Sequence, residues 1–377
     1  MIPVFRPSIT EAEIEAVAEV LRSGWWGLGP KTHQFEQEFA SFIGARYAVG
    51  LNSATAALHL GLHVLDVEGG EVITTPMTFI STNHAILYNR AIPVFADIRP
   101  DTLNIDVADI ERKITPRTKA IMTMHYGGHP CEIDEILALA RPRGIKVIED
   151  AAHACGAEYK GRRIGSHTDA ACFSFHAVKN LATGEGGALS VQDPELEGRL
   201  RRLRWMGITK DTWERSEDLT KYSWYYNVEE VGFKCHMNDI PAAIGLVQLR
   251  RLPETNARRR SIAERYNAGF AGLEWLERPV ERPYVKSSFH NYVVKVPDRD
   301  RFTAYLQQNG IATSVHYIPN HLYSMYKPYY TPLPVAEDIW HRIVTLPLFP
   351  DLTDEQVDHV IGVVQAFGRE VAPVRRA

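Results

Sequence analysis

Asp150 and Lys179 are the two residues whose types and spacing first suggest chemistry. Asp150 ends the apolar segment KVIED (146–150), and Lys179 follows the next apolar segment, ACFSF (171–175), within FSFHAVKNLATGEGG. A lysine amine forms Schiff bases with carbonyl groups, and a carboxylate keeps a pyridinium nitrogen protonated so that the ring accepts electrons. If the two side chains meet, they predict pyridoxal phosphate (PLP) chemistry.

Each residue also has an ordinary interpretation. Asp150 would serve equally as a cap for a helix in the next segment, AAHACGA (151–157), and a single lysine such as Lys179 is most often a surface residue. The PLP interpretation therefore needs a further feature, a site for the phosphate group.

The segment NSATAAL (52–58) is a candidate for that phosphate site. It follows an apolar segment and opens a predicted helix, so the Ser53 hydroxyl and the free N–H groups near Ala54 and Thr55 would bind an anion. The alternative is that Ser53 is only a helix cap and that the small residues only allow close packing.

The elements that must position these residues are short apolar segments alternating with helical stretches. The strand candidates are YAVGL (47–51), EVITT (71–75), IPVFA (92–96), AIMTM (120–124), KVIED (146–150), ACFSF (171–175) and ALSV (188–191). Such alternation predicts an α/β fold with a mostly parallel sheet covered by helices. Ligands of such sheets bind beyond the carboxyl ends of the strands, where Asp150 and Lys179 would converge.

Two capping boxes and one boundary organise the rest of the chain. Thr10 to Glu13 and Thr353 to Gln356 each predict the start of a helix, and Gly24 ends the first of these helices. A boundary near 248–260 divides the chain into a large domain, 1–250, and a smaller α+β domain, 251–377. In the second domain, NYVVKV (291–296) predicts a strand, and 299–310 predicts a helix that ends at Gly310.

Composition narrows the class of function. The net charge of the 377 residues is −4, and the arginine-rich stretches 199–204 and 258–260 are interpreted as solvated helix faces, so we expect no nucleic-acid partner. The four cysteines have no zinc-ligand spacing, so we expect no metal and reduced core residues. No leader or long apolar run is visible, so we expect a cytoplasmic protein with no membrane partner.

At this point the chain resembles a known family, the DegT/DnrJ/StrS-type sugar aminotransferases, which are PLP enzymes with the aspartate-aminotransferase-like fold (fold type I). The similar blocks, in order, are GWWGLGPKTHQFEQEFA, NSATAALHLGL, TTPMTFISTNHAILYNRAIPVFADI, MHYGGHPCEID, VIEDAAHACGA, FSFHAVKNLATGEGG, GFKCHMNDIPAAIGLVQL and ATSVHYIPNHL. They cover most of the chain.

The resemblance implies roles for individual residues. Lys179 would bind PLP covalently, Asp150 would pair with the pyridine nitrogen, and Phe79 would stack on the ring. His153 would lie near the pyridoxal hydroxyl, and Ala54, Thr55 and Ser174 would join Ser53 at the phosphate. Without the family, Phe79 would be interpreted as core and His153 as a partly buried structural histidine.

The block GFKCHM departs from the usual pattern of the family. Lys234 and His236 stand where the family most often has Asn and Arg, and the Asn reaches the phosphate of the neighbouring subunit. Some members that act on nucleotide-linked sugars also have lysine there. The resemblance therefore implies a homodimer with shared active sites, in which Lys234 is the expected phosphate contact and His236 the less certain one.

The resemblance also implies a function, the transfer of an amino group from an amino acid, with L-glutamate expected, to a nucleotide-linked 4-keto sugar in amino-sugar, surface-polysaccharide or lipopolysaccharide biosynthesis. Trp26, His316, Tyr317 and His321 would bind the substrate, with Trp25 and Lys327 nearby. The alternatives are a free keto-sugar acid or keto-inositol as acceptor, and a regulator that binds PLP or a sugar without turnover. A related sugar dehydratase is disfavoured, since those enzymes replace the lysine with histidine.

Overall fold

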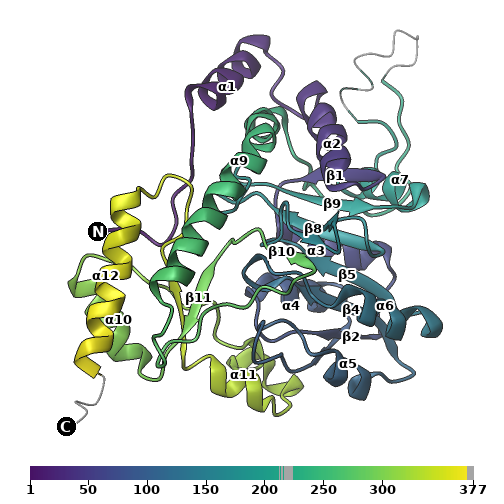
Figure 1. Cartoon of the computed structure of the whole chain (residues 1–377). Helices are drawn as coiled ribbons and strands as arrows, with labels where there is room; N and C mark the ends of the chain where they lie inside the picture. The colour runs from purple at the N-terminus through teal and green to yellow at the C-terminus, as the bar shows by residue number, and fades with distance from the viewer. Residues whose placement is uncertain (212, 214, 216–223, 372–377) are drawn as a thin grey trace, which may run out of the picture.

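A seven-stranded sheet is the centre of the computed structural model, which describes residues 1–211, 213, 215 and 224–371 (Figure 1). The strand order is β1-β9-β8-β5-β4-β2-β3, and only β9 runs antiparallel to its neighbours. The strands are β1 (Tyr47–Leu51), β2 (Glu71–Thr74), β3 (Ile92–Phe95), β4 (Thr118–Met124), β5 (Lys146–Asp150), β8 (Ala170–Ser174) and β9 (Gly187–Val191). All seven predicted strands are therefore confirmed, and so is the mostly parallel sheet.

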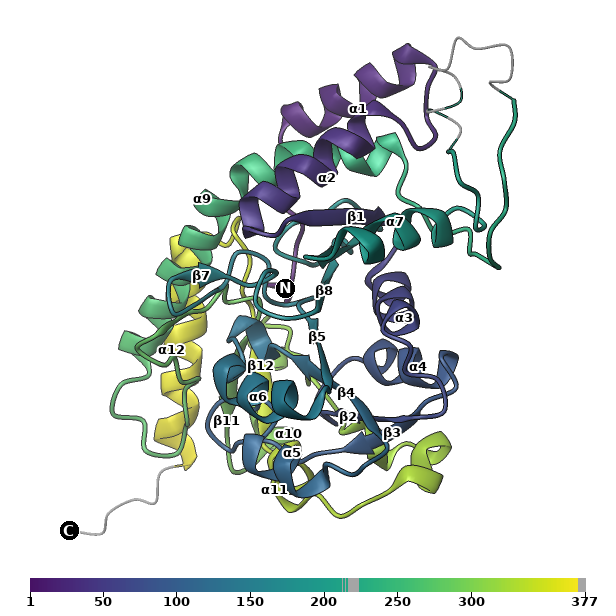
Figure 2. The ribbon, with the colours of Figure 1, turned by 90° about the vertical axis from the view of Figure 1, so that its right-hand side faces the viewer.

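Helices cover both faces of this sheet. Figure 2 shows α3 (Ala54–Val64) and α4 (Ile80–Tyr88) on one side, with α5 (Val107–Lys113) and α6 (Ile133–Ala140) on the other. Successive strand residues point to opposite faces, so Val147 packs in the core beneath α6, whereas Ile148 packs in the core beneath α3. Burial on both faces explains why the strands are continuous apolar segments.

The first helix, α1 (Glu11–Ser23), begins and ends where the sequence predicts. Thr10 and Glu13 form the reciprocal capping box, and Gly24 closes the helix in the left-handed conformation, with φ 76°. The apolar face of α1 is less buried than we expect for an amphipathic helix that packs only against its own chain. Ile14 is 53% exposed and Leu21 is 44% exposed, which leaves this face of α1 without a partner in the described part of the chain.

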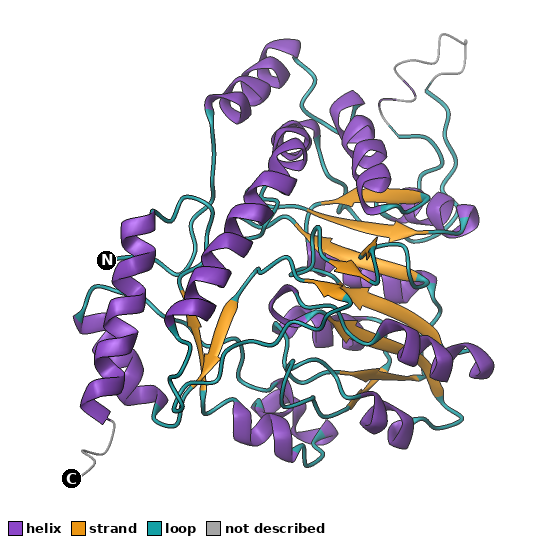
Figure 3. Cartoon of the chain, viewed as in Figure 1, coloured by secondary structure: helices purple, strands orange, loops and turns teal. Residues whose placement is uncertain are grey.

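A second unit lies beside the large sheet. Figure 3 shows its strand pair apart from the main sheet, and Figure 1 shows its helices on the same side of the molecule. The predicted strand and helices are confirmed there, and the second capping box joins Thr353 to Gln356. The elements of this unit are the antiparallel pair β11 (Tyr292–Lys295) and β12 (Ile343–Leu346), with α10 (Arg299–Gln308), α11 (Pro334–Ile339) and α12 (Asp354–Val371).

The long helix α9 (Asp239–Gly269) crosses the predicted boundary at 248–260 without interruption. Its first half buries Leu246 and Leu249 in the core of the large sheet, and its second half buries Ile262 in the core of the second unit. The change of core around Pro253 is compatible with the predicted division at residue 250. The start of the chain does not fit this division, because Ile2, which belongs to the predicted large domain, packs in the second core and pairs with Ile311. The division stays a prediction.

The remaining elements are α2 (Pro30–Ile43), α7 (Pro194–Leu203) and the small sheet of β6 (Glu158–Tyr159), β7 (Arg162–Arg163) and β10 (Val285–Lys286). The interpretation of the arginine-rich stretches as solvated helix faces is wrong for Arg204 and Arg259, because both side chains are buried. The cysteines are unpaired thiols, as predicted. Within the described ranges, no helix has both the length and the apolar character needed to cross a membrane.

Candidate active site

A cavity of about 350 Å³ opens beyond the carboxyl ends of the parallel strands, where the fold class predicts a ligand. Asp150 ends β5 and Ser174 ends β8, so the sheet itself delivers both side chains to the cavity. The cavity brings together most of the predicted site residues, namely Ser53, Ala54, Thr55, Phe79, Asp150, His153, Ser174, Lys179, His316 and Tyr317.

Asp150 is buried at the back of this cavity. One carboxylate oxygen accepts a hydrogen bond from Thr82 Oγ1 at 2.7 Å, and the other accepts one from the Ala152 N–H at 3.0 Å. Burial raises the pKa of Asp150, although these two bonds and the nearby Lys179 oppose the rise. Because residues 151–157 form turns and no helix, Asp150 is not the helix cap that the alternative interpretation required.

Lys179 lies in the loop between β8 and β9 and reaches the same cavity. Among the described residues, its Nζ has no hydrogen-bond partner within the chain. Burial lowers the pKa of Lys179 to about 8, and the Asp150 carboxylate limits that fall. Near neutral pH the uncharged fraction of this amine is therefore much larger than that of an ordinary lysine, and the uncharged form is the one that attacks carbonyl carbons.

The predicted phosphate site lies at the start of α3. Ser53 caps the helix by accepting a hydrogen bond from the Ala56 N–H at 3.1 Å, and the N–H groups of Ala54 and Thr55 belong to the first turn, which has no intrahelical acceptors. Gly187 packs against this turn so closely that a Cβ atom there would lie 2.5 Å from the Ser53 carbonyl carbon. The glycine cluster after Lys179 thus allows β9 to approach the helix start.

The phenyl ring of Phe79 and three polar rings, those of His153, His316 and Tyr317, line the cavity. Phe79 is 58% exposed, so it is not the core residue of the alternative interpretation, and its ring centre lies 6.4 Å from that of Tyr317. Tyr317 Oη lies 3.1 Å from His153 Nε2. Burial and the nearby Lys179 hold the pKa of His153 well below its usual range and lower that of His316 to about 4, so both imidazoles are neutral.

Several residues of the site were not predicted from the sequence, and three of them bear on its chemistry. Phe5 and His290 line the cavity from the start of the chain and from the second unit, and Thr82 binds Asp150 from α4. Thr82 had a weak signal, since it follows Thr78 by one helical turn and the two hydroxyl oxygens lie 2.6 Å apart. Phe5 and His290 had none, because each lies more than a hundred residues from both Asp150 and Lys179.

Three predicted residues do not reach this cavity. Trp26 is 55% exposed on the surface, and its indole N–H donates to the Leu21 carbonyl. His321 is buried elsewhere, with Nε2 3.0 Å from a Glu337 carboxylate oxygen. Lys234 is exposed, and its Nζ lies 3.2 Å from the ring centre of Trp205. The placement of His321 removes the support for its predicted contact with substrate, whereas Trp26 and Lys234 are accessible to a second chain.

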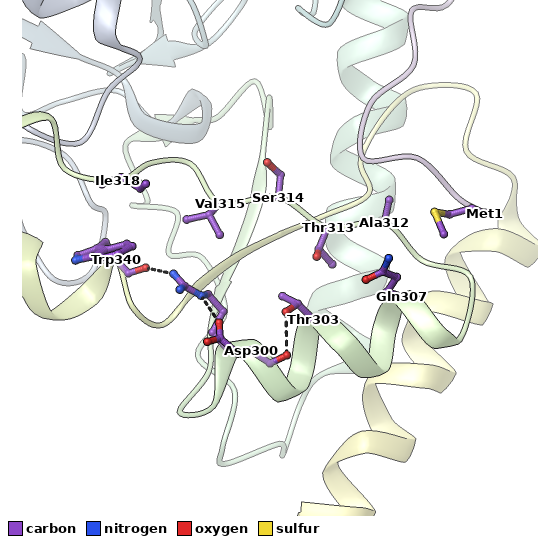
Figure 4. Close-up of a pocket in the computed structure, with 11 residues that line it drawn as sticks. Met1, Asp300, Thr303, Gln307, Ala312, Thr313, Ser314, Val315, Ile318 and Trp340 are labelled. Atoms are coloured by element: carbon purple, nitrogen blue, oxygen red, sulfur yellow. Dashed lines mark hydrogen bonds and ion pairs between the residues drawn. The ribbon is translucent and has the colours of Figure 1, made fainter. Parts of the chain in front are cut away.

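A larger hollow, of about 510 Å³, lies on the second unit between α10 and residues 312–318 (Figure 4). Its one cationic side chain among the described residues, Arg299, is already satisfied, since it donates to the Trp340 carbonyl and pairs with Asp300. The described lining of the hollow includes no lysine, cysteine or histidine and no buried unpaired polar atom. The chemistry therefore favours the smaller cavity at Lys179.

The residues of the smaller cavity fit PLP. The free amine of Lys179 matches an aldehyde, and the buried carboxylate of Asp150 matches a cationic ring nitrogen. The exposed ring of Phe79 offers a face for stacking, and the first turn of α3 offers N–H groups to a phosphate. His153 Nδ1 is a buried polar atom without a hydrogen-bond partner among the described residues, as expected beside a site that receives a polar ligand.

Comparison with known proteins agrees with this geometry. Residues 7–365 match the model of the DegT/DnrJ/EryC1/StrS aminotransferase family. The chain is 44% identical over 376 residues to the spore coat polysaccharide biosynthesis protein SpsC of Bacillus subtilis, which covers 97% of this chain and 96% of that protein.

Solved structures of sugar aminotransferases have the same fold. The PMP form of the putative sugar aminotransferase Spr1654 from Streptococcus pneumoniae superposes with a TM-score of 0.93, at 36% identity over 98% of this chain and 100% of that one. PseC from Helicobacter pylori, an aminotransferase of pseudoaminic acid biosynthesis, gives 0.91, at 30% identity over 98% and 99%. The chain therefore belongs to the DegT/DnrJ/EryC1/StrS aminotransferase family and is a PLP-dependent sugar aminotransferase with the expected aspartate-aminotransferase-like fold.

Proposed function

We propose that the protein transfers the amino group of L-glutamate to a nucleotide-linked 4-keto sugar in the biosynthesis of a surface polysaccharide. The observation that carries the transfer chemistry is the unpaired amine of Lys179 in a cavity backed by the Asp150 carboxylate. The similarity to SpsC, a protein named for polysaccharide biosynthesis, supports the class of acceptor.

Lys179 and Asp150 would hold and move protons. When bound, PLP supplies the carbonyl that takes up the amino group and the ring that withdraws electrons from the reacting carbon. Lys179 Nζ would take a proton from the Cα atom of the donor and deliver it to the carbon on the other side of the transferred nitrogen, for which an amine with a pKa of about 8 is well matched. Asp150 holds a proton on the ring nitrogen, and Thr82 fixes the orientation of its carboxylate.

The other cavity residues would bind and orient. Ser53, Ala54, Thr55 and Ser174 hold the phosphate at the start of α3, and Phe79 holds one face of the ring. His153 would lie beside the ring substituents, and its bond to Tyr317 would connect the cofactor side of the cavity to the substrate side. His316 and Tyr317, from the second unit, contact the sugar.

Exposed apolar side chains on the single chain support a homodimer with shared sites. Apolar side chains are exposed on α1 and on the segment that contains Lys234, among them Ile14 at 53% and Val231 at 88%. Such exposure on a soluble enzyme is typical of surfaces covered by another chain. In the dimer, Lys234 and Trp26 would complete the partner's site. Homodimer assembly and a cytoplasmic location stay predictions.

Mixing two inactive variants tests the shared site. Lys179→Ala and Lys234→Ala protomers are expected to regain part of the activity in heterodimers, because one of the two sites then has both lysines. No recovery from two folded, inactive variants would contradict the sharing.

The covalent role of Lys179 is tested by labelling. Purified protein loaded with PLP is reduced with borohydride and its peptides are mapped, and the label is expected on Lys179.

The substrate assignment is tested by competition. Unreduced protein receives glutamate with either 4-keto-sugar nucleotides or free keto-sugars, and the release of 2-oxoglutarate is measured. Amination of free sugars alone would refute the nucleotide part, and amination of simple 2-keto acids alone would refute the sugar part. A protein that binds PLP but transfers nothing would be the regulator.

A further inference from the structure

His290 is a cavity residue whose chemistry the proposed reaction does not yet use. It is 2% exposed, comes from the loop before β11, and lines the same cavity as Lys179. Its ring is held between two others, stacked on Phe5 at 5.5 Å with an interplanar angle of 6°, and 4.2 Å from the ring of His153. These contacts fix the plane of the imidazole.

A chain of two side-chain amides, Asn256 and the buried Asn180, fixes which nitrogen of His290 carries the proton. The Asn256 amide nitrogen donates to the Cys155 carbonyl at 3.0 Å, so the Asn256 amide oxygen is an acceptor. It accepts from the Asn180 amide nitrogen at 2.8 Å, and that nitrogen also donates to the Ser288 carbonyl. The Asn180 amide oxygen is therefore an acceptor as well, and it faces His290 Nδ1 at 3.0 Å.

Only one tautomer satisfies this chain. Main-chain carbonyls accept and never donate, so both amide orientations are determined, and His290 must donate from Nδ1. In the neutral ring, Nε2 then has a lone pair and no proton. Burial, with the nearby His153 and Lys179, holds the pKa of His290 well below its usual range, which keeps the ring neutral. No other described residue hydrogen-bonds this Nε2.

We propose that His290 positions the acceptor sugar, with Nε2 accepting a hydrogen bond from one of its hydroxyl groups. This proposal rests on the proposed function and deepens it. A fixed lone pair attracts O–H and N–H groups and repels carboxylate oxygens. Near its reacting carbonyl, a keto-sugar carries hydroxyl groups, whereas glutamate carries carboxylates. The same atom therefore favours the sugar in the second half of the reaction and contributes nothing to the binding of the donor carboxylates.

Two substitutions separate the two nitrogens of His290. In His290→Asn, the amide nitrogen takes the place of Nδ1 and keeps the bond to Asn180, but no atom remains at the place of Nε2. In His290→Gln, the longer side chain returns an amide oxygen to that place. The exposed His359→Asn, on α12, is the handling control. Each PLP-loaded variant is measured in both half-reactions by single turnover, with glutamate and then with the keto-sugar.

The expected result is a split between the half-reactions. His290→Asn lowers kcat/KM for the sugar about tenfold, the effect of one lost hydrogen bond, with the glutamate half-reaction within about twofold of wild type. His290→Gln recovers part of the loss. With the deoxy analogue that lacks the contacted hydroxyl group, wild type is expected to lose about tenfold in kcat/KM. His290→Asn is expected to have the same kcat/KM for that analogue and for the full sugar.

Other outcomes overturn the proposal in distinguishable ways. Equal losses in both half-reactions indicate a structural role or a contact with the donor amine. Wild-type kinetics in His290→Asn show that Nε2 contacts no substrate. If His290→Asn does not fold, the deoxy analogues are tested with His290→Gln and wild type instead. If neither of these proteins distinguishes any analogue from the full sugar, the proposal is refuted. If wild-type protein aminates no sugar, the proposed function fails first, and this proposal fails with it.

Discussion

Two clusters of charge, one beside β1 and one at the carboxyl end of β5, differ in how completely their charges are paired. Glu36, on α2, accepts hydrogen bonds from the Gly50 N–H at 2.7 Å, from Arg201 at 2.8 Å and from Arg204. Arg204 in turn donates to the Gly50 carbonyl at 3.0 Å. In the cavity, by contrast, Lys179 has no hydrogen-bond partner among the described residues.

The comparison shows how the same residue types serve structure or chemistry. Despite burial, the Arg204 and Arg201 guanidinium groups hold the pKa of Glu36 far below its usual range, so the carboxylate is permanently charged. Burial without a close partner does the reverse at the active site, lowering the pKa of Lys179 and raising that of Asp150. Paired charges fix α7 to β1, and unpaired ones remain available to a ligand.

Removal of the amine should have the largest effect. Lys179→Ala is expected to lower kcat by at least ~10⁴-fold, because it removes the group that transfers the proton. The protein should still bind PLP noncovalently through the start of α3 and Asp150. Turnover and PLP absorbance are measured together, with Lys146→Ala on β5, which is half exposed, as control. Substantial turnover in Lys179→Ala would remove this residue from the mechanism.

The paired cluster should respond in stability. Glu36→Gln is expected to lower the free energy of unfolding by about 3–5 kcal/mol, because Arg204 then remains buried without its counter-charge. Glu38→Gln, on the same helix but at the surface, should change it by less than about 1 kcal/mol. Urea unfolding of the apoprotein measures both, with Lys179→Met expected to be no less stable than wild type. A loss in Lys179→Met equal to that in Glu36→Gln would erase the contrast.

Asp150→Asn should have a smaller effect, on rate alone. A neutral amide does not stabilise a protonated ring nitrogen, so the glutamate half-reaction is expected to slow by about 10²–10³-fold while the fold is kept. Single-turnover absorbance measures the rate, and the exposed Asp134→Asn is the control. An unchanged rate would refute the pairing of Asp150 with the ring.

The smallest expected effect is in the pH dependence of PLP uptake by the apoprotein. Only the uncharged amine reacts, so the rate should rise with pH and reach half its maximum near pH 8, below the range of an ordinary lysine, because burial lowers the pKa of Lys179. In Asp150→Asn the midpoint should move to lower pH, because the carboxylate charge that supports the protonated amine is gone. Stopped-flow absorbance follows uptake, and a free lysine derivative corrects for titration of PLP itself. A midpoint near pH 10 would show that Lys179 is not desolvated.

Much of the fold was predictable because its signals are local. Each strand of the large sheet is an apolar segment bounded by turns, and the caps at Thr10 and Thr353 depend on residues three positions apart. The extent of α9 was not predictable in this way, because the predicted domain boundary at 248–260, which contains Pro253, suggested a break. The helix continues through this segment, because packing in one core stabilises its first half and packing in another core stabilises its second half.

The sequence by itself determined that Lys179 and Asp150 would meet, because parallel strands bring residues at or beyond their carboxyl ends to one edge of the sheet. Only the tertiary structure decided which other residues meet them. Phe5, Thr82 and His290 lie at the site, whereas His321 lies outside it and is bonded to Glu337. Such contacts depend on how the second unit packs against the sheet. No local pattern specifies that packing, because it arises from buried contacts between segments far apart in the chain.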